Sequence, residues 1–553
     1  MTHAGVSPHR FEDRRDPFNG VSLLPRSESR FETPVGHVPQ AALIEHLMTT
    51  IRGRVVPWEP HIAELFEFLE HRRESPEKAA RRLTPQGELR YTDPIYGPKL
   101  LPPWIVDLLD TAPLIRLGGI HQHTTCMTAR GASINYSRLT HSIGASILAL
   151  DAAESLGLSN KETKLLGALA LLHDARHGPG SHIYDHIHIA GKRFDHDATL
   201  IDFLRCNDVM HALNNIDLTP DDIARHLRGS TAVLAASAAA DPGSIPRQLA
   251  ELSSRYSPYG YLAKVICDRA NYVPLDVAQA TFFTAGMRDD ITASARDFVN
   301  AFEFDRTRNL IVCPIERTHS IERFVEWRAH SFERIAFAKT TQACNAFYRR
   351  ELESAEKQLP SPRVIDVFRD ASTYMIDSEL LAYFSDKGRE VLLSGDFESH
   401  LALLAEIRAE DMTERGREAM KVRQIHEELP FICGSLFYRG HHPLVARVPN
   451  SPPTMTFYIR GHNGEVTPVE FAPTVSRFDI SAPDLGLVRS PHIPADYKVR
   501  EVLICAYWGS DPAAGRPALI EAQRRIQAWL KDMQYIVPGA TVTTPLDSLQ
   551  HEL

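Results

Sequence analysis

Two histidines and two aspartates, spread over three segments of the chain, are the residues best suited to do chemistry. His173 and Asp174 are adjacent, follow an apolar run and precede a loop rich in glycine and proline. His141 lies upstream within residues 138–142, and Asp268 lies far downstream. Imidazole nitrogens and carboxylate oxygens together suit a divalent transition ion. The four residues therefore predict a metal site with coordination positions left open for water and a substrate.

Three further histidines and four arginines accompany these ligands. With an unperturbed pKa near 6.5, histidine can donate a proton to a leaving oxygen, and arginine suits bidentate contact with phosphate oxygens. Taken singly, such residues are more often core or surface groups, so the prediction rests on the ordered set. The predicted proton-transfer residues are His177, His182 and His196, and the predicted anion-neutralising residues are Arg116, Arg138, Arg269 and Arg328.

Helical periodicity predicts the elements that position these residues. Apolar residues at helical spacing indicate one helix over 142–156 and a second over 160–172, with Asn160 as its N-cap. The second helix delivers His173 and Asp174 at its carboxyl end. Further helices are expected at 41–82 (as a pair), 199–214, 244–268, 319–357 and 374–426.

The pattern changes after about residue 439. Residues 454–460 and 465–471 are rich in β-formers and flank a Gly-His-Asn-Gly turn, which predicts a hairpin. Residues 499–508 predict another strand, and 517–533 an amphipathic helix. We expect a mainly α protein: a helical core with a smaller C-terminal α+β appendage. The predicted division is a mobile N-terminal arm (1–38), N-terminal helices (39–89), the helical core (90–435) and the α+β region (436–553).

Composition excludes several classes of protein. Hydrophobic residues make up 43% and charged residues 24% of the 553, as in folded globular chains. The formal net charge of −9 gives no overall basic field, so a nucleic-acid partner is possible but not indicated. The seven scattered cysteines do not form a disulfide or zinc-thiolate pattern, and no run reaches the roughly 20 apolar residues that a membrane span needs. We expect a cytoplasmic protein without membrane insertion.

The motifs resemble those of the HD-domain superfamily, and within it the dNTP triphosphohydrolases. The strongest is His173-Asp174-x-x-His177-Gly178-Pro179-x-Ser181-His182. The other segments that follow the family's order are residues 91–97, 109–113, 116–122, 131–133 and 137–142, and then Asp268, Tyr272 and Asp276. The similarity runs from about residue 90 to about residue 345.

The resemblance implies a role for each site residue. It makes His141, His173, Asp174 and Asp268 the ligands of a divalent metal, which could be Mn, Mg, Fe, Co, Ni or Zn. It places His177, His182 and His196 around the α-phosphate, with His182 as the proton donor, so that these three and Asp174 are the catalytic residues. The substrate-binding residues that it implies are Gln122 and Asp276 at the sugar, Tyr272 on the nucleotide, and Arg138, Arg269 and Arg328 at the phosphates.

The resemblance also implies a nucleotide triphosphate substrate and a homo-oligomer, a tetramer or hexamer. Three departures leave selectivity and regulation open. His123 stands where relatives often carry an apolar residue beside the sugar, and Ala336 or Phe337 where an aromatic residue usually excludes a 2′-hydroxyl. In vertebrate members an Asp, a Gln and an Arg bind an activating guanine nucleotide. Here Asp110 keeps the first while Ile115 and Gly118 replace the others, so activation of that kind is not expected.

The favoured hypothesis is thus a metal-dependent hydrolase that converts a dNTP into a deoxynucleoside and inorganic triphosphate. Two alternatives stay open. One is an HD-domain phosphohydrolase acting on a nucleoside monophosphate, ppGpp or a cyclic oligonucleotide, because the metal interacts only with phosphate. The other is a nucleotide-sensing or nucleic-acid-binding module without turnover, although such a module needs no proton donor.

Overall fold

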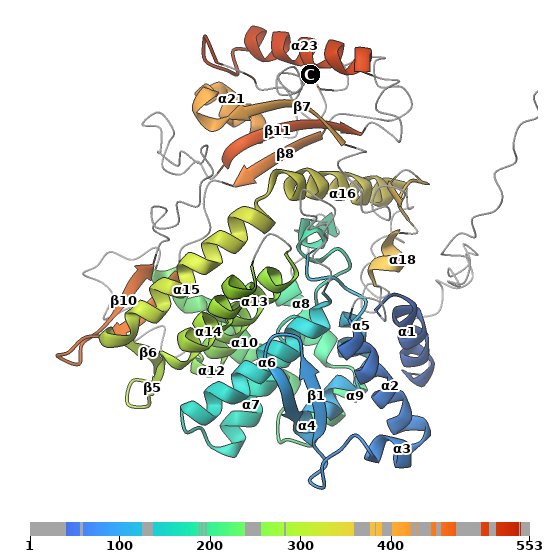
Figure 1. Ribbon diagram of the computed structural model, residues 1–553, viewed down its shortest axis with the longest axis vertical. Coiled ribbons are helices and arrows are strands. Elements are labelled where there is room, and N and C mark those ends of the chain that lie inside the picture. The colour runs from blue at the N-terminus through green and yellow to red at the C-terminus, as the bar shows by residue number, and fades with distance from the viewer. Residues whose placement is uncertain are drawn as a thin grey trace, which may run out of the picture.

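The protein is mainly α-helical, with a smaller α+β part at one end of the molecule, which confirms the predicted fold class (Figure 1). The predicted arm at 1–38 lies outside the described residues. The computed structural model describes residues 40–55, 59–123, 136–186, 188–189, 192–193, 196–237, 256–280, 284–358, 376–381, 383–386, 388–389, 401–421, 429, 444–449, 455–471, 499–507, 516–540 and 542.

Helices α6 (Arg138–Ser155), α7 (Asn160–Leu172) and α13 (Asp268–Gln279) pack together at the centre of the helical core. The core also contains a pair of N-terminal helices, as predicted for 41–82. The other helices before residue 310 are α1 (Gln40–Val55), α2 (Pro60–Glu74), α3 (Pro76–Ala80), α4 (Pro103–Leu109), α5 (Ala112–Leu117), α8 (His196–Leu204), α9 (Asn207–Asn214), α10 (Pro220–Ser237), α12 (Pro258–Tyr261) and α14 (Ala285–Asn300).

Both helices that carry the predicted histidine ligands begin with a capped first turn. The Ser137 side chain accepts a hydrogen bond from Thr140 N at the start of α6. At α7 the cap is Ser159 rather than the predicted Asn160, which is the first helical residue. Ser159 and Glu162 form a reciprocal capping box, so two of the otherwise unpaired backbone N–H groups are satisfied. These caps fix where each helix begins and therefore which residues reach the site.

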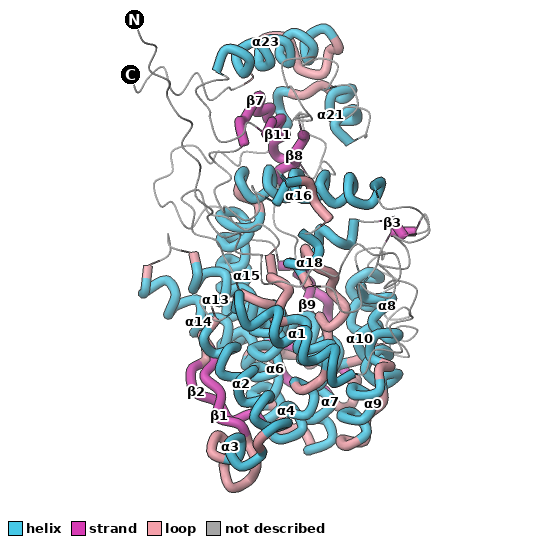
Figure 2. The backbone as a smooth tube through the Cα atoms, turned by 90° about the vertical axis from the view of Figure 1, so that its right-hand side faces the viewer, coloured by secondary structure: helices cyan, strands magenta, loops and turns pink. Residues whose placement is uncertain are grey.

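The C-terminal α+β part is built around a three-stranded antiparallel sheet in the order β7-β11-β8. Helix α23 (Arg516–Asp532) covers one face of this sheet, and α16 (Lys339–Gln358) lies between the sheet and the helical core (Figure 2). The strands are β7 (Leu401–Arg408), β8 (Leu444–Pro449) and β11 (Val499–Tyr507). The remaining helices are α15 (Thr318–Ser331), α18 (Asp377–Leu381) and α21 (Glu414–Lys421).

The predicted hairpin at 454–471 is confirmed as β9 (Met455–Arg460) and β10 (Val466–Phe471). Its strands do not join the C-terminal sheet, however: β9 pairs in parallel with β6 (Leu310–Pro314), which pairs with β5 (Glu303–Asp305). These pairings cross the predicted limit at residue 436, and the domain limits themselves stay predictions. The two remaining hairpins are β1 (Leu89–Asp93) with β2 (Gly97–Leu101), and β3 (His188–Ile189) with β4 (Lys192–Arg193).

The prediction of a helix over 374–426 is wrong for the middle of that range. Residues Leu401–Arg408 form β7, and the short helices α18 and α21 lie before and after it. The segment Leu-Ala-Leu-Leu-Ala-Glu-Ile-Arg has a strongly helix-forming composition. Pairing with β11 along its length and burial of its apolar side chains override that preference.

Candidate metal centre

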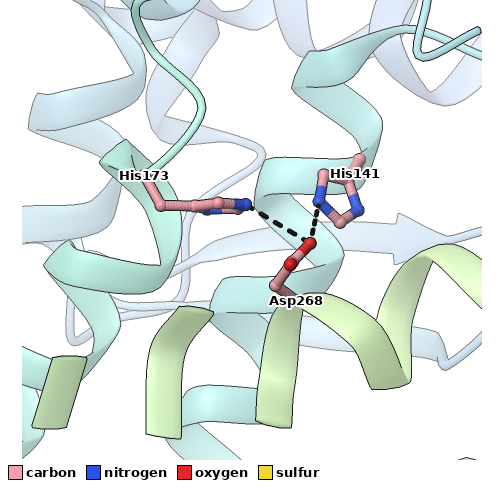
Figure 3. A group of neighbouring side chains, drawn as sticks. All are labelled: His141, His173 and Asp268. Atoms are coloured by element: carbon pink, nitrogen blue, oxygen red, sulfur yellow. Dashed lines mark ion pairs between the residues drawn. The ribbon is translucent and has the colours of Figure 1, made fainter. Parts of the chain in front are cut away.

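His141, His173 and Asp268 converge from three helices on one point (Figure 3). His141 lies in the first turn of α6, His173 is the C-cap of α7, and Asp268 is the first residue of α13. His141 Nε2 and His173 Nε2 lie 3.0 Å and 3.5 Å from Asp268 Oδ1. The three potential ligand atoms lie within 4.8 Å of one another. The structure therefore brings together three of the four predicted metal ligands in a geometry that a single cation can bridge.

The hydrogen bonds of the two imidazoles favour metal binding through Nε2. His141 Nδ1 donates to Asn271 Oδ1 at 2.8 Å, and His173 Nδ1 donates to the Ala170 carbonyl at 2.8 Å. Because both acceptors lack a proton to give, Nδ1 carries the hydrogen and Nε2 presents its lone pair. Both Nε2 atoms are buried, and their nearest polar neighbours are the carboxylates of Asp268 and Asp174. Imidazole nitrogens and carboxylate oxygens gathered in this way fit a divalent ion.

Local packing explains how α13 reaches this position. A π-helical turn, Leu262–Cys267, precedes Asp268, and such turns change which side chains face a site. Asn271 packs directly against Gly144 of α6, where an added Cβ would lie 2.1 Å from the Asn271 Nδ2. Glycine at this position lets the two helices approach closely enough for Asn271 to hold the His141 ring.

The electrostatics of the site favour positive charge. Burial opposes ionisation, but the carboxylates of Asp174 and Asp268 outweigh it and raise the pKa of His173 to about 9. Burial also acts against the charge on Asp268, yet His141 and His173 hold the pKa of that carboxyl well below its usual range. A divalent cation would take the place of the extra proton, so metal binding and protonation compete here.

The predicted fourth ligand, Asp174, lies beside the three. Its Oδ2 lies 3.8 Å from His141 Nε2, and its Oδ1 lies 3.3 Å from His173 Nε2. The same carboxylate is paired with the buried Arg138 guanidinium. Despite the opposing effect of burial, His173 and Arg138 keep the pKa of Asp174 well below its usual range. Its role as a ligand stays a prediction.

The three predicted proton-transfer histidines form a cluster next to Asp174. His177 stacks on His196 with ring centroids 3.8 Å apart, and His182 meets His177 edge-on at 4.8 Å. His177 Nε2 lies 3.3 Å from Asp174 Oδ1. Burial, with help from Arg138 and His196, lowers the pKa of His177 well below its usual value. His177 is therefore neutral at physiological pH, whereas His182 is exposed at the surface of the cluster.

A second group of predicted residues lies along α13. Arg328 Nε of α15 donates to the Tyr272 hydroxyl oxygen at 2.8 Å, and its guanidinium lies 4.6 Å from the Phe332 ring centroid. Burial lowers the pKa of Arg269, and the positive charge of Arg328 lowers it further. Two arginines and a tyrosine hydroxyl are thus close together, one helical turn from Asp268, where they could neutralise an anion.

The predicted sugar-reading carboxylate, Asp276, is held by three protein groups. His123 Nε2 and the Tyr136 hydroxyl each donate to its Oδ1 at 2.7 Å, and the Ser331 hydroxyl donates to its Oδ2 at 3.3 Å. Asp276 is two helical turns from Asp268 on the same face of α13. Gln122, the other predicted sugar contact, is buried, and its side-chain Oε1 makes no hydrogen bond.

Arg116, one of the predicted anion-neutralising residues, supports the loop after His173. It is fully buried, and its guanidinium donates to the carbonyls of Ala175 and His177 at 3.0 Å and 2.6 Å and lies over the Phe203 ring. Its role in neutralising an anion stays a prediction.

Asp110, the residue linked by resemblance to a guanine-nucleotide activator, is paired with Arg73 and lies 3.9 Å from Arg72 NH1. Both arginines belong to α2, and Gly118 lies against Phe66 of that helix. Helix α2 therefore contacts two of the three positions linked to such an activator. The expectation that guanine-nucleotide activation of that kind is absent stays a prediction.

Sequence reasoning missed two residues that orient the site. Asn271 holds His141, and Ser181 accepts hydrogen bonds from the Arg138 guanidinium through its hydroxyl. Asn271 follows Asp268 by three residues, one helical turn, and Ser181 lies within the glycine-proline loop motif. These spacings were visible in the sequence, but no periodicity shows which neighbour an amide or a hydroxyl contacts.

The site defines a helical protein with a metal-binding capacity next to a cluster of histidines and arginines. No family model matches the chain. Over 142 residues the chain is 34% identical to the deoxynucleoside triphosphate triphosphohydrolase SAMHD1 homolog of Dictyostelium discoideum. That match covers 24% of this chain and 27% of the relative, so the chain is similar to about a quarter of the relative's length. Of the helices that the structure describes, none has the length and apolar content to cross a membrane.

Proposed function

We propose that this protein is a metal-dependent hydrolase that cleaves a (deoxy)nucleoside triphosphate into the nucleoside and inorganic triphosphate. The observation that carries the proposal is the convergence of the buried Nε2 atoms of His141 and His173 on the Asp268 carboxylate. Partial similarity to a protein named as a deoxynucleoside triphosphate triphosphohydrolase supports the substrate class. The proposed homo-oligomer and the cytoplasmic location stay predictions.

His141, His173 and Asp268, with Asp174 beside them, would hold the divalent ion, which when bound would polarise an α-phosphate oxygen and lower the pKa of a bound water. The oxygen of the water forms the new bond to the α-phosphorus and its proton passes to solvent, while the bond from phosphorus to the 5′-oxygen breaks. His182 gives its proton to the departing 5′-oxygen, with His177 and His196 packed against it. Arg138 keeps Asp174 ionised, and Arg269 and Arg328 offset the charge of the phosphates.

The alternative, a phosphohydrolase acting on another nucleotide, is favoured by one observation. Asp276 already accepts hydrogen bonds from His123, Tyr136 and Ser331. A sugar hydroxyl would have to share or replace these partners, and His123 brings a polar ring where an apolar contact is usual by resemblance. In this alternative, the Asp276 carboxylate determines which sugar the site prefers, and therefore which nucleotide is the substrate. The metal ligands do not.

Product analysis tests the proposal. Purified protein is incubated with each dNTP and each NTP in the presence of Mn²⁺ or Mg²⁺, and the nucleosides, nucleotides and inorganic phosphates are resolved by chromatography. We expect a nucleoside and intact triphosphate in equal amounts, and no release by Asp268→Asn, which keeps the side-chain size but loses the charge. Release of pyrophosphate or orthophosphate would support the alternative hydrolase. Tight nucleotide binding without products would support a sensor.

A further inference from the structure

Asp377 lies about 200 residues downstream of the metal-ligand motif, yet its carboxylate contacts two segments of the site. Asp377 begins helix α18. Its Oδ1 accepts a hydrogen bond from Gly180 N at 2.7 Å, and its Oδ2 accepts two from His121, one from the backbone N at 2.9 Å and one from Nδ1 at 2.8 Å. A single mostly buried carboxylate thus joins the loop after His177 to the segment before Gln122.

The loop at Gly180 needs such support because of its backbone conformation. Gly180 has φ +77° and Ser181 has φ 56°, so two consecutive residues are left-handed. For a residue other than glycine this conformation is unfavourable, and it persists only where the surroundings hold it. An added Cβ at Gly180 would lie 2.7 Å from the Tyr348 ring, so α16 presses on the same loop.

The left-handed turn at Gly180 and Ser181 positions side chains that contact residues of the candidate site. The Ser181 hydroxyl accepts hydrogen bonds from the Arg138 guanidinium and donates to the Gln122 carbonyl at 2.8 Å. Arg138 in turn is paired with Asp174. His182 follows Ser181 directly, so a change in the turn would move the predicted proton donor and the partner of Arg138 together.

We propose that Asp377 is a positioning residue for hydrolysis at this site: its carboxylate holds the Gly180-Ser181 turn against the His121 segment and so keeps His182 and Arg138 in place. The expected effect of Asp377 on turnover rests on the proposed function. Its expected effect on the conformation of the Gly180-Ser181 turn is independent of that function. None of the described contacts joins Asp377 to His141, His173 or Asp268, so we expect metal binding by these three side chains to be unaffected.

The test compares three variants. Asp377→Ala removes all three acceptor contacts, whereas Asp377→Asn keeps an oxygen for Gly180 N and should be partly active. Glu379→Gln is the matched control. Glu379 lies two residues further on in the same helix, where it binds His46 of α1 at 2.9 Å and accepts a hydrogen bond from Ile376 N at 3.1 Å, and glutamine keeps an oxygen that can accept that hydrogen bond. We expect Asp377→Ala to lower kcat by roughly 10- to 100-fold with little change in KM, as for a misplaced catalytic group. Metal affinity should match that of the wild type in all three.

Hydrogen exchange separates this inference from the proposed function, because it needs no substrate. Peptides covering residues 174–186 should exchange faster in Asp377→Ala and Asp377→Asn than in the wild type or Glu379→Gln. Equal exchange in all four proteins would overturn the inference, as would equal losses of kcat in Asp377→Ala and Glu379→Gln, which would indicate a loss of stability alone. A wild type without hydrolysis of any nucleotide would contradict the proposed function, and the exchange data would still decide whether Asp377 holds the loop.

Discussion

The metal centre depends on the protonation pattern of two imidazole rings. Asn271 and the Ala170 carbonyl each take the Nδ1 hydrogen of one histidine, and this leaves both Nε2 lone pairs directed at Asp268. The candidate ligands could be proposed from the sequence because His173-Asp174 and Asp268 lie in a recognisable order, and the structure brings His141, His173 and Asp268 together. The groups that set the tautomers could not, because a backbone carbonyl has no sequence signature and an amide partner depends on tertiary contact.

Asn271 gives a prediction at this scale. Asn271→Ala should weaken Mn²⁺ binding roughly 10- to 100-fold, because the His141 ring loses the acceptor that fixes its orientation. Asn271→Asp retains an acceptor oxygen and should keep most of the affinity. Calorimetric titration with Mn²⁺ measures the effect, with Asn214→Ala on the exposed side of α9 as the control. Unchanged affinity in Asn271→Ala would show that the ring is held by other contacts.

Among the elements, the helices that build the site were the most predictable. The apolar spacing of 142–156 and 160–172 corresponds to α6 and α7, although α6 begins four residues earlier, at Arg138, and the cap of α7 is Ser159 instead of the predicted Asn160. The strand β7 was not predictable, because Leu401–Arg408 combines leucine, alanine and glutamate, and its partner β11 lies about 100 residues away. Hydrophobic periodicity is judged over a short stretch of residues, so it cannot predict pairing between strands that lie so far apart in the sequence.

The cap of α7 gives a prediction at the scale of the element. Glu162 accepts hydrogen bonds from Arg306, Tyr259 and Ser159 N, and chiefly the Arg306 contact lowers the pKa of Glu162 to about 2. A carboxyl whose pKa is lower in the folded state contributes stability above its unfolded pKa, and this is lost as the pH falls toward the folded value. Glu162→Gln should therefore cost about 1 kcal/mol at pH 7.

Urea unfolding followed by circular dichroism at pH 7, 5 and 3.5 checks this prediction. The difference in unfolding free energy between Glu162→Gln and the wild type should be constant above the usual carboxyl pKa and should shrink at pH 3.5. Glu154→Gln, at an exposed position of α6, serves as the control and should show no such pH dependence. A difference that grows on acidification would contradict the assigned contacts.

At the scale of the whole molecule, the described residues form two separate apolar clusters. The larger unites the helices around the metal centre with β6, β9 and β10. The smaller lies between the C-terminal sheet and α23 and includes Ile407, Ile504 and Ile526. Helix α16 lies between the two parts, and the Lys339 ammonium at its start lies 2.7 Å from Glu406 of β7. An exposed pair of this kind contributes little to stability, so any coupling between the two parts comes mainly from the packing of α16 against β8.

The separation of the two apolar clusters predicts two thermal transitions with different metal dependence. Only the helical core contains the metal ligands, and an ion at 100 times its dissociation constant adds about 2.7 kcal/mol to the part that binds it. Scanning calorimetry with and without Mn²⁺ should show one transition that moves to higher temperature and one that does not. His173→Ala should abolish the movement. A single transition that shifts as a unit would mean that the clusters unfold together.

The central claim is that His141, His173 and Asp268 hold one divalent cation through the two Nε2 atoms and a carboxylate. Anomalous diffraction at the manganese edge from crystals soaked in Mn²⁺ tests it most directly. We predict one anomalous peak per chain between these three side chains, within bonding distance of both Nε2 atoms. No peak at that point at saturating Mn²⁺, or a peak only elsewhere on the chain, would contradict the account.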